Sequence, residues 1–420
     1  MKEMTSRERV LTSLNHEEPD RVPLDLGGLS TTIETAPYSE LKKYLGVKSE
    51  TKLFLRDHVE PPEEVLKRFG IDTRYLRMRP PKNFRVQIDP DNSYLDEWGT
   101  RWKKPESSLY YDPVDWPFKD ATKEDLETYH WPDPYDPGRT EGVREEAKRL
   151  HEKTDYAIIA DMPVLGIFES ALVCLRGMER LMMDLILDKP FAKALLNKLA
   201  DIHIEFYHNY LDAVGDCIDI IMVSDDLGAE NAPLISPELY REMVKPAQKK
   251  LWQFIKGNTK AHLFHHSCGS VYKLIPDLIE IGVDILNPIQ VAAKDMDSKR
   301  LKEEFGDSLT FWGGVDTQKI LPYGSPEDVE VEVKKRIADM APGGGYVLTA
   351  VHNIQAGVRP ENICMMYDAA RKHGRYPIDL CLLWHIHNPY IEVTHAIGVK
   401  GDLLPIRAPG RKDIPGQVVG

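Results

Sequence analysis

The chain has 420 residues, and its 54 basic and 67 acidic side chains give a formal net charge of −13. The charge is spread along the sequence with no basic stripe, which argues against a nucleic-acid-binding surface. The five cysteines form no CxxC pair, and no apolar run approaches the roughly 18 residues that span a bilayer. We expect a soluble, cytoplasmic protein that contacts neither nucleic acid nor membrane; a homodimer is compatible with the sequence.

The beginning of the chain predicts the order helix, strand, helix, helix, strand. Thr5 or Ser6 could cap the first helix, because side-chain oxygens at that position accept a backbone N–H. The first strand is a short apolar alternation that two glycines close into a loop. The predicted ranges are a helix at Arg7–Leu14, a strand at Arg21–Gly28, helices at Tyr38–Leu45 and Glu60–Phe69, and a strand at Asp72–Met78.

Residues 79–135 differ in composition from the rest of the chain. They are rich in proline and tryptophan, and Val86–Gly99 has the pattern of a hairpin. Proline at this density interrupts regular elements, and long insertions in compact domains are usually functional. We interpret the segment as an inserted cap or lid after the second strand; the alternative is a surface decoration that only buries its tryptophans.

From residue 142 onward, apolar strands alternate regularly with amphipathic helices. This pattern indicates a parallel sheet with helices on its outer face. With the two early strands the count is about eight, the number that closes a TIM (β/α)8 barrel. An open doubly wound sheet is the alternative, but no glycine-rich phosphate loop follows the first strand. The predicted strands are 156–162, 218–225, 261–268, 283–287, 309–314 and 346–351, and the helices are 142–153, 189–214, 237–256, 271–281 and 326–340.

The C-terminal extension, residues 377–420, is unlike the α/β part, residues 1–376. It opens with an apolar stretch containing His385 and His387 and ends rich in proline and glycine. We expect this extension to form an interface or a strap over the barrel, rather than a second metal site.

Polar residues follow the strands, at the ends where the active sites of TIM barrels lie. The loops at this rim converge on one mouth, so residues far apart in the sequence meet there. Asp226 and Asp316 also have a structural interpretation as caps of the following helices. The residues are Asp161, Ser224, Asp225, Asp226, His266, Cys268, Asn287, Gln290, Asp316 and His352.

The segment Ala261–Gly269 contains the strongest metal-ligand pair in the sequence. Alternate side chains of a strand share a face, so His266 and Cys268 should project together while His265 points away. Imidazole and thiolate suit zinc, and His352 at the same rim is a candidate third ligand. A buried histidine beside a free cysteine can also be plain packing.

A series of ordered motifs resembles the uroporphyrinogen decarboxylase superfamily, and more closely its cobalamin-dependent methyltransferase branch. The resemblance runs from near the N-terminus to about Tyr376. The motifs are Arg7–Val10 with Pro19–Pro23, Ser224–Ala229 with Ile235–Tyr240, His266–Gly269, Leu286–Gln290, Phe311–Asp316, Gly343–Tyr346 with His352, and Pro360–Asn362.

The methyltransferase branch holds zinc with a His-x-Cys pair and a late ligand, often cysteine, after the last strand. This chain keeps His266 and Cys268 and has His352 where that cysteine falls. True decarboxylases of the superfamily carry an arginine-rich loop after the first strand, whereas the loop Asp25–Ile33 contains no arginine. A polyanionic tetrapyrrole would lack charge-assisted bonds there.

The resemblance therefore implies a zinc-dependent methyltransferase acting between a corrinoid (cobalamin) partner protein and a small thiol, pterin, methoxy or methylamine compound. Asp226 and Asp316 are its candidate catalytic residues, orienting the substrate or moving protons. Asp161, Asn287 and Gln290 are candidate substrate-binding residues. The alternatives are a metal-free decarboxylase of a tetrapyrrole or related acid and a non-catalytic corrinoid-binding barrel.

Overall fold

The computed structural model describes residues 3–55, 57–105 and 111–380, which belong to one compact unit. Its strands are β1 Lys52–Leu55, β2 His58–Glu60, β3 Thr73–Leu76, β4 Ser93–Leu95, β5 Arg101–Lys103, β6 Asp112–Asp115, β7 Ala157–Ala160, β8 Ile220–Ser224, β9 His262–His266, β10 Ile285–Asn287, β11 Thr310–Trp312 and β12 Tyr346–Val347. The α-helices are α1 Ser6–Leu14, α2 Thr35–Leu45, α3 Glu63–Phe69, α4 Asp125–Thr128, α5 Val143–Lys153, α6 Ile167–Glu169, α7 Met178–Leu187, α8 Lys189–Val214, α9 Pro237–Leu239, α10 Lys245–Asn258, α11 Ile275–Glu280, α12 Ser298–Phe305, α13 Ile320–Tyr323, α14 Pro326–Met340 and α15 Pro360–His373.

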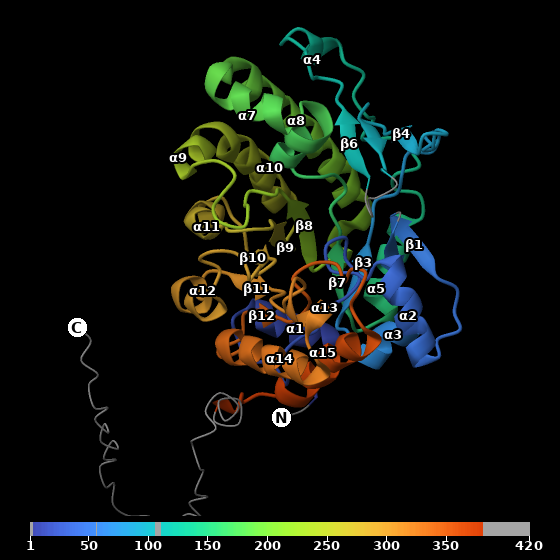
Figure 1. Ribbon diagram of the computed structural model, residues 1–420, viewed down its shortest axis with the longest axis vertical. Helices are drawn as coiled ribbons and strands as arrows, with labels where there is room; N and C mark the ends of the chain where they lie inside the picture. The colour runs from blue at the N-terminus through green and yellow to red at the C-terminus, as the bar shows by residue number, and fades with distance from the viewer. Residues whose placement is uncertain (1–2, 56, 106–110, 381–420) are drawn as a thin grey trace, which may run out of the picture. The chain divides into compact units, whose positions relative to one another are not determined.

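The centre of the fold is a seven-stranded parallel sheet in the order β12-β11-β10-β9-β8-β7-β3. The register places Ser224 of β8 beside His266 of β9, and His266 beside Asn287 of β10. The carboxyl ends of these strands therefore lie level with one another. The sheet curls, with helices around it (Figure 1), and the architecture is TIM-like as predicted.

The segment expected to be the first strand, Arg21–Gly28, is not a regular strand. It makes an isolated parallel bridge between Leu24 and Leu348. Leu348 N donates to Pro23 O at 3.0 Å, and Asp72 N donates to Leu24 O at 2.9 Å. The segment thus connects the two edges of the sheet, but Pro23 has no N–H to donate, which limits the ladder.

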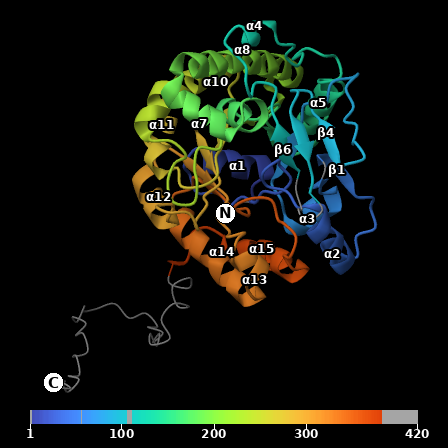
Figure 2. The ribbon, with the colours of Figure 1, turned by 45° about the horizontal axis from the view of Figure 1, so that its top comes forward.

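Two layers of apolar side chains hold the fold together. The inner layer lines the concave side of the sheet and includes Ile159, Met222, Phe264 and Trp312, with Val10 of α1 packed against it. The outer layer lies between the strands and the surrounding helices. Figure 2 shows α8, α10, α11, α12 and α14 in succession around the strands, with α1 inside this ring. Thr5 caps α1 through a capping box with Glu8, as predicted.

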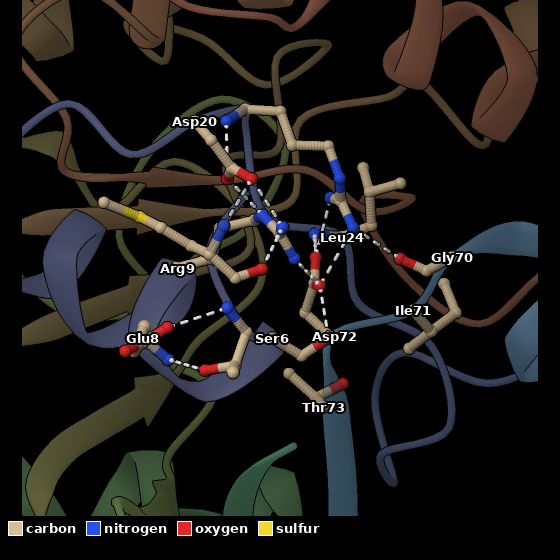
Figure 3. A network of polar contacts seen from close by, with 12 residues as sticks. Ser6, Glu8, Arg9, Asp20, Leu24, Gly70, Ile71, Asp72 and Thr73 are labelled. Carbon is tan, nitrogen blue, oxygen red and sulfur yellow. Dashed lines mark hydrogen bonds and ion pairs between the residues drawn. The ribbon is translucent and has the colours of Figure 1, made fainter. Parts of the chain in front are cut away.

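A buried ionic network fastens α1 and the bridging segment to β3 (Figure 3). Asp72 is fully buried and accepts hydrogen bonds from Arg9 at 2.7 Å and Arg21 at 2.8 Å. It also accepts from Ser6 Oγ at 2.8 Å and from Leu24 N at 2.9 Å. Both carboxylate oxygens are thereby satisfied, as a buried charge requires.

The proline-rich insertion contains an antiparallel sheet in the order β4-β5-β6. The hairpin expected at Val86–Gly99 is instead formed by β4 and β5, since Asp96 accepts from the backbone of Trp98 and Thr100 and fixes the turn there. Trp98 stacks on Phe206 of α8 at a centroid distance of 6.1 Å. The insertion is therefore packed on α8, and its role as a lid stays a prediction.

Most predicted helices are present, but two of them are divided. The helix expected over Val271–Ile281 begins as the 3-10 turn η4 Tyr272–Leu274 and continues as α11. The helix expected over Pro237–Lys256 is divided into α9, a π-helical turn η3 at Tyr240–Val244, and α10. The other short turns are η1 Ser170–Leu175 and η2 Gly215–Cys217. Within the described part of the chain, no helix has the length and apolar character needed to cross a membrane. His385 and His387 of the predicted extension lie outside the described residues.

Candidate metal centre

Three of the predicted metal ligands come together at the carboxyl end of the sheet. His266, Cys268 and His352 each offer a ligand atom, and these atoms lie within 4.8 Å of one another. Cys268 Sγ is 3.6 Å from His266 Nε2, and the two imidazole rings are 5.5 Å apart between centroids. The spacing brings two nitrogens and one sulfur around a common point.

The local backbone explains how β9 delivers two of these side chains. His266 ends the strand on the same face as Phe264, which lines the inner layer. His265 points to the other side and packs on Trp252 of α10 at 4.9 Å between ring centroids, as the register predicted. After Cys268 the chain turns at Gly269, with φ +85°. A Cβ there would lie 2.4 Å from the Gly228 carbonyl carbon, so only glycine fits.

Asn287 fixes which nitrogen of His266 is free. Asn287 Nδ2 donates to Trp312 O at 3.1 Å, which turns its Oδ1 toward His266 Nδ1 at 2.6 Å. Because a carbonyl oxygen only accepts, His266 carries its proton on Nδ1. The lone pair on Nε2 then faces Cys268. Asn287, expected to bind substrate, thus orients a candidate ligand in the manner of outer-shell partners of metal sites.

His352 lies in the loop after β12, and its position is set through Asn353. Asn353 Oδ1 accepts from Thr32 N at 2.8 Å, and its Nδ2 donates to Leu29 O at 2.9 Å. Thr32 and Leu29 belong to the loop Asp25–Ile33, which contains no arginine. This loop therefore helps to hold His352, the third candidate ligand, in place. Burial, with smaller contributions from His266 and His58, lowers the pKa of His352 to about 3. The ring is neutral at physiological pH and able to ligate.

Asp226 adjoins the candidate ligands. Its Oδ1 accepts from Cys268 N at 2.8 Å and lies 4.0 Å from His266 Nε2. Its side chain keeps 41% exposure, so one edge of the carboxylate faces the mouth of the barrel. This contact agrees with a place in the site; its catalytic role stays a prediction.

Two further carboxyls lie behind Asp226. Asp225 accepts from the backbone of Phe168 and Glu169 and from Gln248 Nε2. Burial raises the pKa of Asp225 to about 6. Glu169 accepts from Ser224 Oγ at 2.9 Å. Burial, and then repulsion from Asp226 and Asp225, raises the pKa of Glu169 to about 8. The site thus contains a carboxyl that keeps its proton near neutral pH.

Gln290 joins three loops of the mouth. Its Oε1 accepts from Gly269 N at 2.7 Å, and its Nε2 donates to Glu230 Oε1 at 2.9 Å. Gln318 Nε2 donates to the same oxygen of Glu230 at 2.9 Å. Gln290, expected to bind substrate, therefore fixes Glu230 and the turn after Cys268; contact with a substrate is a prediction.

Asp316 and Asp161 are engaged by the protein itself. Asp316 accepts from Gln318 N at 2.7 Å and Lys319 N at 3.1 Å, which is the capping arrangement left open as an alternative. Asp161 accepts from Leu29 N at 2.9 Å, and its carboxylate is 3.3 Å from Arg77 Nε. Catalysis by Asp316 and substrate binding by Asp161 remain predictions that these contacts do not favour.

Glu169, Glu230 and Gln318 are site residues that the sequence reasoning missed. Each follows a strand of the sheet by several residues: Glu230 and Gln318 lie in loops, and Glu169 ends the short helix α6. Glu169 follows β7 by a turn through Gly166, whose packing against Ser224 O leaves no room for a Cβ. A glycine followed closely by a carboxylate in such a loop is the one local signal, and it is weak.

The donor set fits a zinc ion. Two imidazoles and one thiolate are common zinc ligands, and a catalytic zinc keeps a fourth position open. Burial, followed by the negative charges of Asp226, Glu169 and Glu230, raises the pKa of the Cys268 thiol. A bound cation would reverse that effect, because a coordinated thiol loses its proton.

The sequence of this chain matches one known protein family over most of its length. The family described as uroporphyrinogen decarboxylase (URO-D) matches residues 114–373, more than half of the chain. The chain belongs to the URO-D family. The members of this family include decarboxylases and methyltransferases, so membership indicates an enzyme without deciding the reaction.

Curated relatives in the URO-D family include both kinds of enzyme. Uroporphyrinogen decarboxylase of Pseudoalteromonas atlantica is 28% identical over 188 residues, covering 43% of this chain and 48% of that protein. Methylated-thiol–coenzyme M methyltransferase of Methanosarcina mazei is 26% identical over 170 residues, covering 36% of this chain and 43% of that protein. The chain thus spans less than half the length of these relatives.

Among solved structures, a methyltransferase from Methanosarcina mazei superposes with a TM-score of 0.61. The match covers 88% of this chain and 99% of that chain at 20% sequence identity. At this level of sequence identity, the likeness shows that this URO-D family member and that methyltransferase share a fold, and it does not extend to the reaction.

Proposed function

We propose that this protein is a zinc-dependent methyltransferase that moves a methyl group between a corrinoid protein and the heteroatom of a small molecule. The observation that carries the proposal is the convergence of the ligand atoms of His266, Cys268 and His352 within 4.8 Å. A metal-free decarboxylase has no need of that nitrogen and sulfur set.

Zinc held by these residues would act as a Lewis acid toward a thiol, ether or amine at its open fourth position. The surrounding side chains have separate tasks. Asn287 keeps His266 Nδ1 protonated and Nε2 free. Asp226 fixes the Cys268 backbone and presents its exposed edge to the mouth. Glu169, protonated near neutral pH, would be able to give a proton to a leaving group.

The corrinoid partner and the methyl compound come from the family resemblance. The Methanosarcina mazei relative is named as a methyltransferase acting on methylated thiols and coenzyme M, which supports methyl transfer. The acceptor or donor here is proposed as a thiol, pterin, methoxy compound or methylamine.

Decarboxylation of a tetrapyrrole is the second candidate, because a curated relative is a uroporphyrinogen decarboxylase. The loop Asp25–Ile33 argues against it, since it contains no arginine to bind carboxylate groups. Arg77 reaches this loop by donating to Gly27 O. Its guanidinium also lies 3.3 Å from Asp161, which neutralises its charge.

Metal analysis tests the first half of the proposal. Elemental analysis of the purified protein is expected to give about one zinc per chain. Cys268→Ala and His352→Ala should each reduce zinc affinity by at least about tenfold. Cys217→Ala is the matched control, since Cys217 lies outside the ligand group. A native protein that binds no zinc under zinc-replete conditions would contradict the proposal.

A transfer assay tests the second half. The zinc-loaded protein is expected to demethylate methylcobalamin with at least one thiol or pterin, or to methylate reduced cobalamin from a methoxy or methylamine compound. Cys268→Ala should abolish the reaction. Loss of carbon dioxide from uroporphyrinogen would favour the decarboxylase instead. Binding of cobalamin without any transfer would indicate a non-catalytic corrinoid-binding barrel.

A further inference from the structure

The mouth of the candidate metal centre carries carboxylates that no lysine or arginine neutralises. Among the described residues, the ion pairs include none between Glu169, Asp226 or Glu230 and a lysine or arginine. Within the same described part of the chain, the ion-pair contact of Asp226 is the one with His266, at 4.0 Å, and that ring is charged only when protonated. Elsewhere in the same fold, buried acids such as Asp72 and Asp161 have arginine partners. Asp226, with 41% exposure, and the exposed Glu230 face solvent at the mouth instead and have no such partner among the described residues.

Neutral donors hold each of these carboxylates in place. Glu230 receives amide N–H groups from Gln290 and Gln318, which come from two other loops. Asp226 accepts a hydrogen bond from Cys268 N, and Glu169 accepts one from Ser224 Oγ. Amides and hydroxyls orient a carboxylate without cancelling its charge. The negative field thus persists in the mouth beside Cys268.

Glu169 itself adds no negative charge to the mouth near neutral pH. Its carboxyl retains a proton near neutral pH because it is buried and because Asp226 and Asp225 repel a further charge. With zinc, two positive charges and the Cys268 thiolate leave a net of one positive charge at the metal. Asp226 and Glu230 together outweigh it, so a cation entering the mouth is attracted and an anion is repelled.

We infer that the small molecule bound at this centre carries a positive charge, as an ammonium or quaternary ammonium group, and that Asp226 and Glu230 select it. The inference rests on the proposed function only in taking His266, Cys268 and His352 as the reaction centre. It narrows the substrate from any thiol, ether or amine to a cationic one. Thiols with a carboxylate or sulfonate are excluded from this class.

Three thiols with the same two-carbon chain form the first test, because the group at the far end is cationic in one, neutral in another and anionic in the third. These probes are 2-aminoethanethiol, 2-mercaptoethanol and 2-mercaptoethanesulfonate, titrated calorimetrically into the zinc-loaded protein. The aminothiol should bind about tenfold more tightly than the sulfonate at low salt, and the ratio should shrink as salt screens the field. Equal binding, or tighter binding of the sulfonate, overturns the inference.

Variants assign the selectivity to residues. Glu230→Gln and Asp226→Asn should each reduce the ratio at least about threefold, with the zinc content of each variant measured alongside. The control is Glu152→Gln, an exposed charge just before β7, at the opposite rim of the sheet. An unchanged ratio in both site variants would overturn the assignment.

A second pair of probes separates this inference from the proposed function. Choline and its neutral isostere 3,3-dimethylbutan-1-ol need no metal for recognition, so they are titrated into protein with and without zinc. Preference for choline, reduced in Glu230→Gln, supports the inference even in a protein that takes up no zinc. The absence of any difference between the two probes, including failure of both to bind, overturns it whatever the zinc content.

Discussion

At the scale of single residues, the candidate site depends on hydrogen bonds that orient ligands as much as on the ligands. His266 offers Nε2 because its Nδ1–H donates a hydrogen bond to Asn287 Oδ1, and Asn287 is itself oriented by donating to Trp312 O. The strand register places these residues side by side on β9, β10 and β11. A substitution that leaves all three candidate ligands intact should therefore still weaken metal binding.

Asn287→Ala tests that dependence. The substitution frees the His266 ring to rotate and to change tautomer, and we expect zinc affinity to fall about 10- to 100-fold. Competition with a chromophoric chelator measures the change. Asn258→Ala, at the exposed end of α10, is the control and should leave the affinity unaltered. An affinity in Asn287→Ala within about twofold of the native value would contradict the orienting role.

At the scale of elements, the amino end of the sheet is held by charges and the outer wall by apolar packing. Asp72 ties α1 and the segment after Asp20 to β3 through Arg9 and Arg21. This linkage replaces the regular ladder that Arg21–Gly28 does not form. Helix α8, by contrast, is buried along most of its length and carries the proline-rich insertion on its outer side.

Asp72→Asn should lower the free energy of unfolding by about 3 kcal/mol, because it leaves buried guanidinium charges incompletely compensated. Denaturant unfolding at neutral pH measures the loss. The matched control is Asp368→Asn, which breaks an exposed pair with Arg68 whose two side chains are each 43% exposed. That control should cost under about 1 kcal/mol. Equal losses in the two variants would contradict the account of the network.

His203, on α8, makes the stability of the fold depend on pH. Burial lowers its pKa to about 3, and its Nε2 has no hydrogen-bond partner among the residues that the structure describes. In the unfolded chain a histidine titrates near pH 6.5, so the unfolded state binds more protons between those values. Stability is therefore full above about pH 6.5 and falls as the pH drops toward 3, by about 2 kcal/mol at pH 5.

His203→Leu should remove this part of the acid destabilisation. Free energies of unfolding at pH 7.5 and pH 5 are compared for the native protein, His203→Leu and the exposed control His130→Leu. The difference between the two pH values should shrink by about 2 kcal/mol in His203→Leu and stay the same in the control. An unchanged difference in His203→Leu would show that the ring is charged or exposed in the fold.

At the scale of the whole molecule, local patterns predicted the repeating parts of the fold well. The helices Lys189–Val214 and Pro326–Met340 have the expected bounds, because Asp188 and Ser325 cap them and a proline follows each cap. The alternation of strand and helix implied a common rim, and that rim brings His266, Cys268 and His352 together. These features depend on periodicity and capping, which a sequence displays.

The features that were missed depend on tertiary contacts. The bridging by Leu24 and Leu348 joins residues from the two ends of the chain. Glu230 is held at the site by Gln290 and Gln318. Glu169, at the end of α6, is placed there by its hydrogen bond from Ser224 and by the close packing of Gly166. Asp161 was expected to bind substrate, but its carboxylate forms an ion pair with Arg77, a residue that the sequence did not single out. No local spacing encodes these contacts.

X-ray absorption at the zinc edge tests the central claim most directly, because it counts sulfur and nitrogen neighbours of the metal in the native protein. The account predicts one sulfur at about 2.3 Å and at least two imidazole nitrogens at about 2.0–2.1 Å. Cys268→Ala should remove the sulfur, and His352→Ala should remove one imidazole. A shell without sulfur, or one that Cys268→Ala leaves unchanged, would contradict the assignment of His266, Cys268 and His352 as the metal centre.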